Sequence, residues 1–563
     1  MSEISRLIDD FLADEFETSP TLASSLGLTA YDSRLDDLSA SAFERRDAAA
    51  ATWLDRFAGV PDDALDPDER TDRDLAMSVL RGRLILADWQ NWRREPLTYS
   101  TPLVNGIFNL FLHRLRPESE LAEAALARLA ETPRALEQGR SNLDPLLAHP
   151  VIVERAIGSA RGGIRYLREL LPAEIEATGP RRRLEQAGAA AAEALEDWVR
   201  FLEGLRGAAT GSWQLGEQRY TDLLRERESL TFDARSLRAM GQAEYDRLDG
   251  EMRELAQRIS GSDDWRALIE EANNDHPPTE ERMRQGYADW TGRARDFVIR
   301  TGLVTLPAGE RCSVEPSPVF QRPILGVASY VAPAMFADTV LGHFFVPFAP
   351  DGTPPEEVQK RLAANSYGGI PTTAVHEAYP GHHWHLTMNK VHSRRLRKVF
   401  GTPYFSEGWA LYAERVMRER GFFTEPLHEL YHLEATIFRA ARIVVDTSLH
   451  LGEMTFDEAV TFMTTKVPLP EPTARAEVGR YCAWPTQASA YLTGCLEILR
   501  MRDRYLAARG AGDTPPARVD VRLLRAFHDT LASSGRMPLG LAERALMARV
   551  EAGADMQLQG FSR

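Results

Sequence analysis

Cysteine is scarce in this chain. Three cysteines occur in 563 residues, and they lie far apart: Cys312, Cys482 and Cys495. An odd number at such spacing makes neither a disulfide framework nor a cysteine-based zinc site. Lysine is also rare, because only four of the 67 basic residues are lysines, which we interpret as genomic bias. The net charge of -15 comes without a basic patch of any length, so we expect no nucleic-acid partner.

Long hydrophobic runs are absent as well. No stretch approaches the length of a membrane span, and residues 1–10 lack the basic start and apolar run of a signal peptide. We therefore expect no membrane partner and a cytoplasmic location. The apolar fraction of 44% and the charged fraction of 26% are typical of a soluble globular protein. The length allows two or more domains, or one large enclosing fold.

Helical periodicity dominates the sequence. Apolar residues recur at helical spacing after Ser2, a possible N-cap: Ile4, Leu7, Ile8, Phe11 and Leu12. The same pattern predicts further helices over 40–58, 67–94, 118–138, 151–171, 180–206 and 426–464. Small residues at 207–212 indicate a boundary between an N-terminal helical region (1–210) and a metal-binding catalytic region (211–563). The predicted fold class is mainly α, a large helical fold enclosing a deep cleft.

A small antiparallel β-sheet is predicted within about 302–350, beside the metal-binding helices. Short apolar runs at 303–306, 325–331 and 342–348 are broken by proline and glycine, as strands often are. Residues 342–347 precede the metal motif, so they could form an exposed edge to which a peptide substrate adds a strand. An internal hairpin that fills the core is an equally good interpretation.

The sharpest chemical signal lies at residues 372–385. Four of the thirteen histidines fall in this stretch and a fifth, His392, follows soon after it; His376 is followed directly by Glu377. Two histidines one helical turn apart can hold one zinc ion, with the intervening glutamate as the base. Here Pro380 occupies the place of the second histidine, so we expect the regular helix to be interrupted. A bulge at Pro380 and Gly381 would bring His382 to that place, with His383 as the rival ligand.

A second motif follows at 404–414, Tyr-Phe-Ser-Glu-Gly-Trp-Ala-Leu-Tyr-Ala-Glu. Glu407 and Glu414 are seven residues apart and would share one face of a helix, with apolar residues between them. A carboxylate on an apolar face needs a partner. We predict Glu407 as the third metal ligand and Glu414 as an acceptor for the N–H of a ligating histidine. The alternatives are a helix terminus with exposed histidines and a surface helix with solvated carboxylates.

The paired motifs, His-Glu-Ala-Tyr-Pro-Gly-His-His and Glu-Gly-Trp-Ala-Leu-Tyr-Ala-Glu, resemble the bacterial family catalogued as domain of unknown function 885. Members of that family are predicted zinc peptidases. The likeness extends from residues 19–23 near the start to 477–481 and 485–488 near the end. It implies a metallopeptidase-like enzyme. Where the family pattern often reads Pro-Gly-Gln, this chain has Pro-Thr-Gln at 485–487.

One face of the helix at 426–464 carries charged side chains three or four residues apart: Arg439, Arg442, Asp446 and His450. A ladder of satisfied ion pairs would explain them. The resemblance implies instead that this face points into the cleft and contacts substrate, together with Arg480, Gln487 and Tyr491. A zinc peptidase also needs a donor for the developing oxyanion, and we predict Tyr481 and His450 for that role.

The predicted mechanism is metal-assisted hydrolysis. Zinc held by His376, His382 and Glu407 would lower the pKa of its bound water to about 7. Glu377 would take that proton and return it to the leaving amine. A short peptide is the expected substrate, by analogy with other helical zinc peptidases. The alternatives are a non-peptide amide or ester, an iron oxygenase, and a non-catalytic protein that only captures a ligand.

Overall fold

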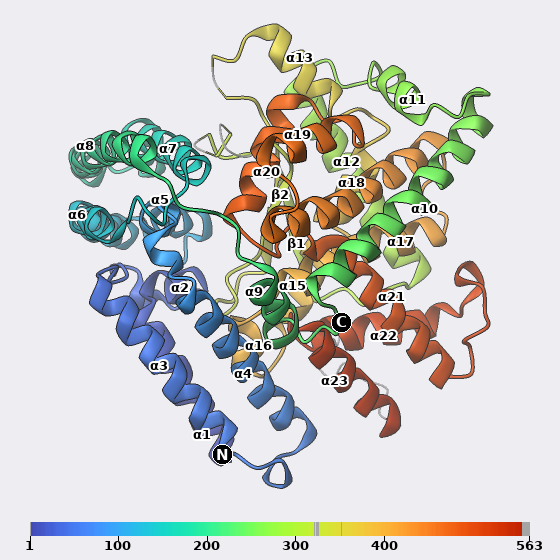
Figure 1. Cartoon of the computed structure of the whole chain (residues 1–563), viewed down its shortest axis with the longest axis horizontal. Coiled ribbons are helices and arrows are strands. Elements are labelled where there is room, and N and C mark those ends of the chain that lie inside the picture. The colour runs from blue at the N-terminus through green and yellow to red at the C-terminus, as the bar shows by residue number, and fades with distance from the viewer. Residues whose placement is uncertain (1, 320, 323–325, 351, 554–563) are drawn as a thin grey trace. The chain divides into compact units, whose positions relative to one another are not determined.

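Helices make up most of the chain (Figure 1). The computed structural model describes residues 2–319, 321–322, 326–350 and 352–553. Within these residues one sheet of three strands accompanies the helices. The predicted mainly α fold class is therefore confirmed. The chain divides into two compact units, and each is described by itself.

The first unit comprises Met1–Gln214 with the described parts of Pro318–Gly326 and Ala334–Thr339. Its α-helices are α1 (Glu3–Thr18), α2 (Pro20–Ser25), α3 (Ala40–Ala58), α4 (Pro67–Asp88), α5 (Leu97–His113), α6 (Glu118–Asn142), α7 (Pro150–Arg165) and α8 (Thr178–Ala208). In α1 the five apolar residues predicted from periodicity are all buried, and the Ser2 side chain accepts the backbone N–H of Ser5. The first helix therefore forms and packs as its sequence predicts.

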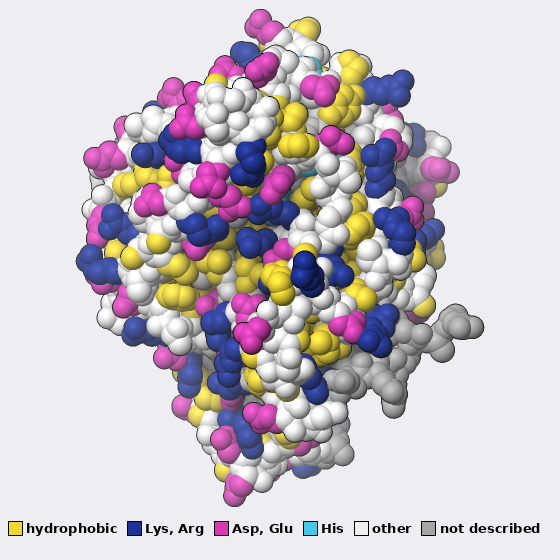
Figure 2. Space-filling view, turned by 90° about the vertical axis from the view of Figure 1, so that its right-hand side faces the viewer, with side chains coloured by type: hydrophobic (Ala, Val, Ile, Leu, Met, Phe, Trp, Pro, Cys, Tyr) yellow, Lys and Arg dark blue, Asp and Glu magenta, His cyan; other side chains and the backbone are white. Residues whose placement is uncertain are grey.

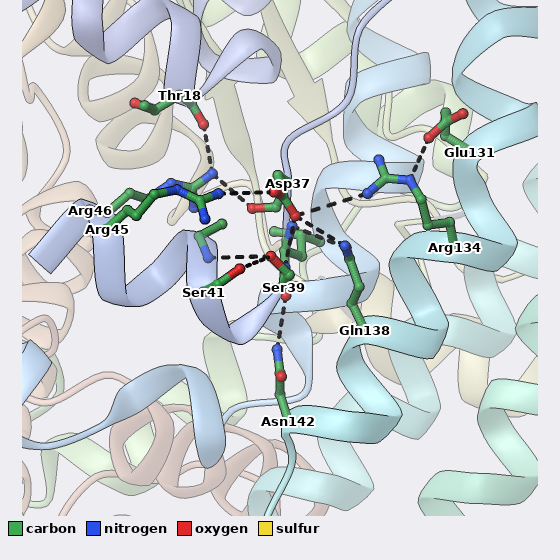
Figure 3. Close-up of polar contacts among 12 residues, drawn as sticks. Thr18, Asp37, Ser39, Ser41, Arg45, Arg46, Glu131, Arg134, Gln138 and Asn142 are labelled. Carbon is green, nitrogen blue, oxygen red and sulfur yellow. Dashed lines mark hydrogen bonds and ion pairs between the residues drawn. The ribbon is translucent and has the colours of Figure 1, made fainter.

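Polar contacts hold the loop before α3 against α6 (Figure 3). The side chain of Asn142 donates to the Leu38 carbonyl at 2.8 Å, and Gln138 donates to Asp37 at 3.0 Å. Further along α6, a Cβ on Gly139 would come within 2.7 Å of aromatic rings on α5 and α8. Glycine therefore lets α6 approach these rings closely.

The second unit comprises Leu215–Ser317, Val327–Pro333 and the chain from Val340 onward. Its α-helices are α9 (Glu217–Asp222), α10 (Ala234–Ser260), α11 (Trp265–Ala272), α12 (Glu280–Thr301), α13 (Pro355–Ala363), α14 (Ile370–Glu377), α15 (His382–Lys390), α16 (Arg395–Val399), α17 (Pro403–Glu419), α18 (Pro426–Leu451), α19 (Phe456–Thr465), α20 (Glu471–Ala483), α21 (Ala490–Ala508), α22 (Val521–Ser533) and α23 (Leu539–Glu551). The residues of both predicted metal motifs lie in this unit.

The sheet has the strand order β1-β3-β2, formed by β1 (Arg311–Pro316), β2 (Ser329–Val331) and β3 (Leu341–Val346). β2 and β3 are antiparallel, but β1 and β3 are parallel, so the prediction of an antiparallel sheet is wrong for one pair. Residues 317–340 separate β1 from β3, and a connection of that length allows a crossover to a parallel strand. β3 is paired on both sides and mostly buried, so the predicted exposed edge at 342–347 is also wrong.

The predictions of the other strands are confirmed only in part. Residues 303–306 form no strand, although Leu303 and Val304 are buried. Of the run at 325–331, residue 325 lies outside the described residues and β2 covers the last three. β1 was not predicted because its sequence, Arg-Cys-Ser-Val-Glu-Pro, is polar and half exposed. Hydrophobic runs therefore indicated where the chain is buried better than where strands pair.

Close backbone approaches fix the helices around the metal motifs. A Cβ on Gly408 of α17 would lie 2.5 Å from the Gly494 backbone of α21, and one on Gly494 would lie 2.0 Å from the Tyr404 carbonyl. Gly241 of α10 similarly leaves room for Ile443 of α18, which a Cβ would meet at 2.5 Å. Side chains at these glycines would push the helices apart, so the small residues set the spacing.

Surface charge is mixed on the face of the molecule that Figure 2 shows, where basic side chains are interspersed with acidic ones. This distribution fits the net charge of -15. The absence of a nucleic-acid partner stays a prediction.

Candidate metal centre

The histidine motif spans two helices instead of one bulged helix. α14 ends at Glu377 and α15 begins at His382, so the predicted bulge is corrected to a break of four residues. A Cβ on Gly381 would lie 2.0 Å from the His376 carbonyl oxygen, which no side chain could tolerate. The peptide bond between Tyr379 and Pro380 is cis. The break allows the start of α15 to fold back against the end of α14.

This break brings two histidines together with a glutamate of α17. Ligand atoms of His376, His382 and Glu407 all lie within 4.8 Å of one another. The Nε2 atoms of His376 and His382 lie 3.6 and 3.3 Å from one carboxylate oxygen of Glu407. The two imidazole rings are nearly perpendicular, with centroids 4.8 Å apart. We call these three residues the metal triad, and they are the set predicted from the sequence.

Glu414 lies behind the triad and holds His376 in place. Its carboxylate is 2.7 Å from Nδ1 of His376 and 3.3 Å from Nδ1 of His432 on α18. Burial would raise the pKa of Glu414, but the hydrogen bonds from these two histidines lower it to about 2. An ionised carboxylate only accepts hydrogen bonds, so both Nδ1 atoms donate. When His376 is neutral, its lone pair is therefore on Nε2, which lies 3.6 Å from the Glu407 carboxylate.

Electrostatics at the triad favour a cation. Burial would lower the pKa of His376, but hydrogen bonds to Glu407 and Glu414 raise it to about 9. For Glu407, burial is outweighed by the charges of the nearby histidines, and its pKa is lowered. Glu377, next to His376, is also buried. Three carboxylates around two imidazoles fit a divalent ion, and nitrogen and oxygen donors in this number suit zinc.

Glu377 has the environment of a general base. The residue is 7% exposed, and burial raises its pKa, against the opposing effect of His376 and His382. A raised pKa suits a carboxylate that must take and return a proton near neutral pH. Glu377 is therefore next to a residue of the triad and holds a proton more strongly than an ordinary glutamate.

His383, the rival ligand, belongs to another network. Its Nδ1 lies 2.8 Å from the Tyr330 hydroxyl, and its Nε2 lies 2.9 Å from the Glu310 carboxylate. Arg295 and the Tyr379 hydroxyl also bond to Glu310. Successive residues of a helix point about 100° apart, so α15 directs His382 to the triad and His383 to Glu310. Both nitrogens of His383 are engaged in hydrogen bonds.

The two predicted oxyanion donors do not lie free at the triad. His450 is fully buried: its Nδ1 accepts the Leu215 N–H at 3.4 Å, and its Nε2 donates to the Tyr481 carbonyl at 3.0 Å. Tyr481 is fully buried too, and its hydroxyl donates to Glu477 at 2.8 Å. Each donor is used by a buried partner in this structure, and the oxyanion role of both residues stays a prediction.

The predicted substrate-binding residues do lie together, around the same Glu477. Arg442 and Arg480 each bond to its Oε2 atom, at 2.7 and 2.8 Å. Arg480 also donates to Gln487, which in turn donates to the Tyr491 hydroxyl. The remaining member, Arg439, lies with its guanidinium 6.0 Å from the centre of the Tyr491 ring. Asp446 and His450 of the predicted face have other partners: Asp446 accepts from Tyr220, and His450 bonds to the backbone of Leu215 and Tyr481. Substrate binding by the remaining residues stays a prediction.

A family model described as a bacterial protein of unknown function, DUF885, matches residues 20–546. The chain belongs to the DUF885 family. No curated protein matches it. The resemblance seen in the two motifs is thus confirmed at the level of the family.

Two solved structures share the DUF885 chain's fold. One is a putative lipoprotein of unknown function from Shewanella oneidensis, with 20% identity, a TM-score of 0.77, and coverage of 97% of this chain and 100% of that one. The other is a putative lipoprotein from Colwellia psychrerythraea, with 20% identity, a TM-score of 0.81, and coverage of 98% and 99%. Among the described helices of this DUF885 member, none is both long and apolar enough to cross a bilayer. The cytoplasmic location stays a prediction.

Three residues around the site were missed from the sequence. His432 lies seven residues before Arg439, so helical spacing on α18 could have placed it on the same face. Glu310 and Tyr330 come from an irregular segment and a short strand. No local pattern connects them with a histidine more than fifty positions away, so only the fold brings them together.

Proposed function

We propose that this DUF885 protein is a zinc-dependent hydrolase that cleaves short peptides. The observation that carries the proposal is the metal triad with Glu377 directly beside it. Two histidines and one glutamate from a second helix form a catalytic zinc set that leaves a position open for water. Glu407 has a side chain that is 20% exposed, so solvent can reach the triad.

When bound by His376, His382 and Glu407, zinc would supply Lewis acidity toward a carbonyl oxygen and toward water. Glu377 would take the proton of the attacking water and pass it to the leaving nitrogen. Glu414 would keep His376 in the tautomer that presents Nε2. Glu414 bonds to His376 directly, and the charge of Glu377 interacts with His376, His382 and Glu407.

The same donor set also occurs in non-haem iron oxygenases. Glu377 favours hydrolysis, because holding a metal does not require a buried base beside it. A non-peptide amide or ester would use the same groups. Elemental analysis and a screen of small amides against peptides separate these possibilities.

The first test is metal content per chain, measured by elemental analysis of untagged protein. We expect about one zinc in the wild type, and loss of zinc in His376→Ala, His382→Ala and Glu407→Ala. His383→Ala is the matched control on α15, because its nitrogens bond to Tyr330 and Glu310. No metal in the wild type after incubation with zinc would overturn the proposal.

The second test is Glu377→Gln. This change keeps the shape of the side chain but removes its ability to take a proton, so we expect full zinc content and no measurable peptide hydrolysis. Retained hydrolysis in a zinc-loaded Glu377→Gln variant would contradict the proposed role.

A further inference from the structure

Two arginines bond to one carboxylate, and a third arginine lies against the same Tyr491 ring as one of them. Arg439 and Arg442 lie on α18, and Arg480 lies on α20. The ion pairs of Arg442 and Arg480 and the hydroxyl bond of Tyr481 all converge on Oε2 of Glu477. We call Arg439, Arg442, Arg480 and Glu477 the arginine cluster.

The arginine cluster has more positive than negative charge. Glu477 is ionised, since the charges of Arg442 and Arg480 outweigh its burial and lower its pKa to about 2. It balances only one of these two guanidiniums. Arg439 is offset separately, because its charge interacts with Glu434, Glu377 and the ionised Glu414. Arg442, Arg480 and Glu477 together keep a net charge of about +1 in a largely buried place, which is costly without an anion.

Hydrogen-bond capacity is left over as well. Among the described residues, the Nε atoms of Arg439 and Arg480 are buried and have no hydrogen-bond partner. Guanidinium groups match planar carboxylates with paired N–H donors. The side chains of Arg480 and Glu477 remain 18% and 15% exposed, so a small ligand can reach them.

Aromatic rings keep the cluster in position. The Arg442 guanidinium lies 4.1 Å from the centre of the Phe438 ring and 4.7 Å from that of Tyr491. Stacking of this kind stabilises a cation and restricts its movement. The donors are therefore held ready for an anion.

Arg439 connects the cluster to the metal triad. It lies two turns along α18 from His432, and His432 bonds to Glu414 behind the triad. The charge of Arg439 also interacts with Glu377 and with Glu414. An anion held by the cluster would therefore lie a few helical turns from the groups that surround the triad.

We propose that the arginine cluster binds the free C-terminal carboxylate of the peptide substrate, so that the cleaved bond lies near that end. This inference rests on the proposed zinc peptidase function. A monovalent carboxylate matches the small excess of positive charge better than a doubly charged phosphate does. The enzyme would thus remove a short segment from the C-terminus.

The experiment compares N-acetylated peptides with a free C-terminus against the same peptides as C-terminal amides. In the wild type we expect kcat/KM to be about 10- to 100-fold higher for the acid, as loss of a charge-assisted hydrogen bond would predict. Arg480→Gln should bring the ratio close to one, mainly by raising KM for the acid. Arg500→Gln on α21 is the matched control, because its partners are Glu497 and Glu543.

Each outcome decides the inference. Equal cleavage of acid and amide by the wild type would overturn the carboxylate site while leaving a zinc peptidase. A preference that persists in a zinc-loaded Arg480→Gln protein would overturn the assignment to this cluster. Hydrolysis of neither peptide by zinc-loaded protein would overturn both proposals. Should Arg480→Gln not fold, the acid-to-amide ratio of the wild type and of Arg439→Gln decides instead.

Discussion

Glu414 offers the sharpest test of how the fold prepares the metal triad. Its carboxylate accepts one hydrogen bond from His376 and one from His432, and it is fully buried. Glu414→Gln keeps the size of the side chain but replaces one acceptor oxygen with an N–H donor. One of the two histidine N–H groups would then face another donor.

The expected cost follows from these contacts. A hydrogen bond to a charged group contributes about 1.5–3 kcal/mol, and a buried donor without a partner costs about 1–3 kcal/mol. Both values describe the same lost contact and are not added, so we expect the free energy of unfolding to fall by about 1.5–3 kcal/mol. His376 would also be less firmly held in its ligating tautomer, and zinc affinity should fall by about 10- to 100-fold.

Zinc affinity is measured by competition with a chromogenic chelator at neutral pH, and stability by thermal unfolding of the metal-free protein. Glu419→Gln is the matched control, because Glu419 lies on the same helix, α17, but bonds to Arg415 and Arg502 instead of histidine. Both variants should lose stability, and only Glu414→Gln should lose zinc affinity. Unchanged affinity in Glu414→Gln would refute the claim that this carboxylate orients His376.

Three other predictions concern single residues. Gly381→Ala should abolish zinc binding, because its Cβ would lie 2.0 Å from a carbonyl oxygen of α14. Gly158→Ala in α7 is the control, since the space around its Cβ is open. Elemental analysis should find its zinc content unchanged. Burial raises the pKa of Glu95 to about 7, so the folded state keeps a proton that the unfolded chain loses, and stability should fall as pH rises from about 4.5 to 7. Glu95→Gln should remove that fall, up to about 3 kcal/mol, in thermal unfolding at pH 5 and 8; an unchanged slope would contradict the assignment. Tyr330→Phe should cost about 1–3 kcal/mol by leaving a buried nitrogen of His383 unpaired, yet retain full zinc content by elemental analysis.

The helices and the metal triad could be predicted from local sequence patterns. The apolar spacing in α1 is a property of neighbouring residues, and so is the adjacency of His376 and Glu377. Glu407 could be predicted because a carboxylate on an apolar helix face demands a partner. These signals come from residues close together in the sequence, and the structure forms helices at those residues.

What escaped prediction depends on contacts that are distant in sequence. The polar strand β1 exists because β3 pairs with it, and β3 is central because strands join it from both sides. The spacing of His450 on α18 predicted that it would point into a cleft. Instead its ring forms hydrogen bonds with the carbonyl of Tyr481 and the N–H of Leu215. Local sequence patterns do not identify a hydrogen-bond partner that lies far away in the chain.

The three ligands come from the ends of three helices, and separate contacts fix each end. Glu414 holds the ring of His376 at the end of α14, the close approach at Gly381 fixes the start of α15, and Gly408 sets α17 against α21. A triad fixed in this way is preorganised on rigid elements, so its geometry should change little between substrates. Choice of substrate must then depend on side chains beyond the triad, and the arginine cluster is the group of such side chains with uncompensated charge. Changes at Arg480 should therefore alter which peptides are cleaved without altering how much zinc is bound.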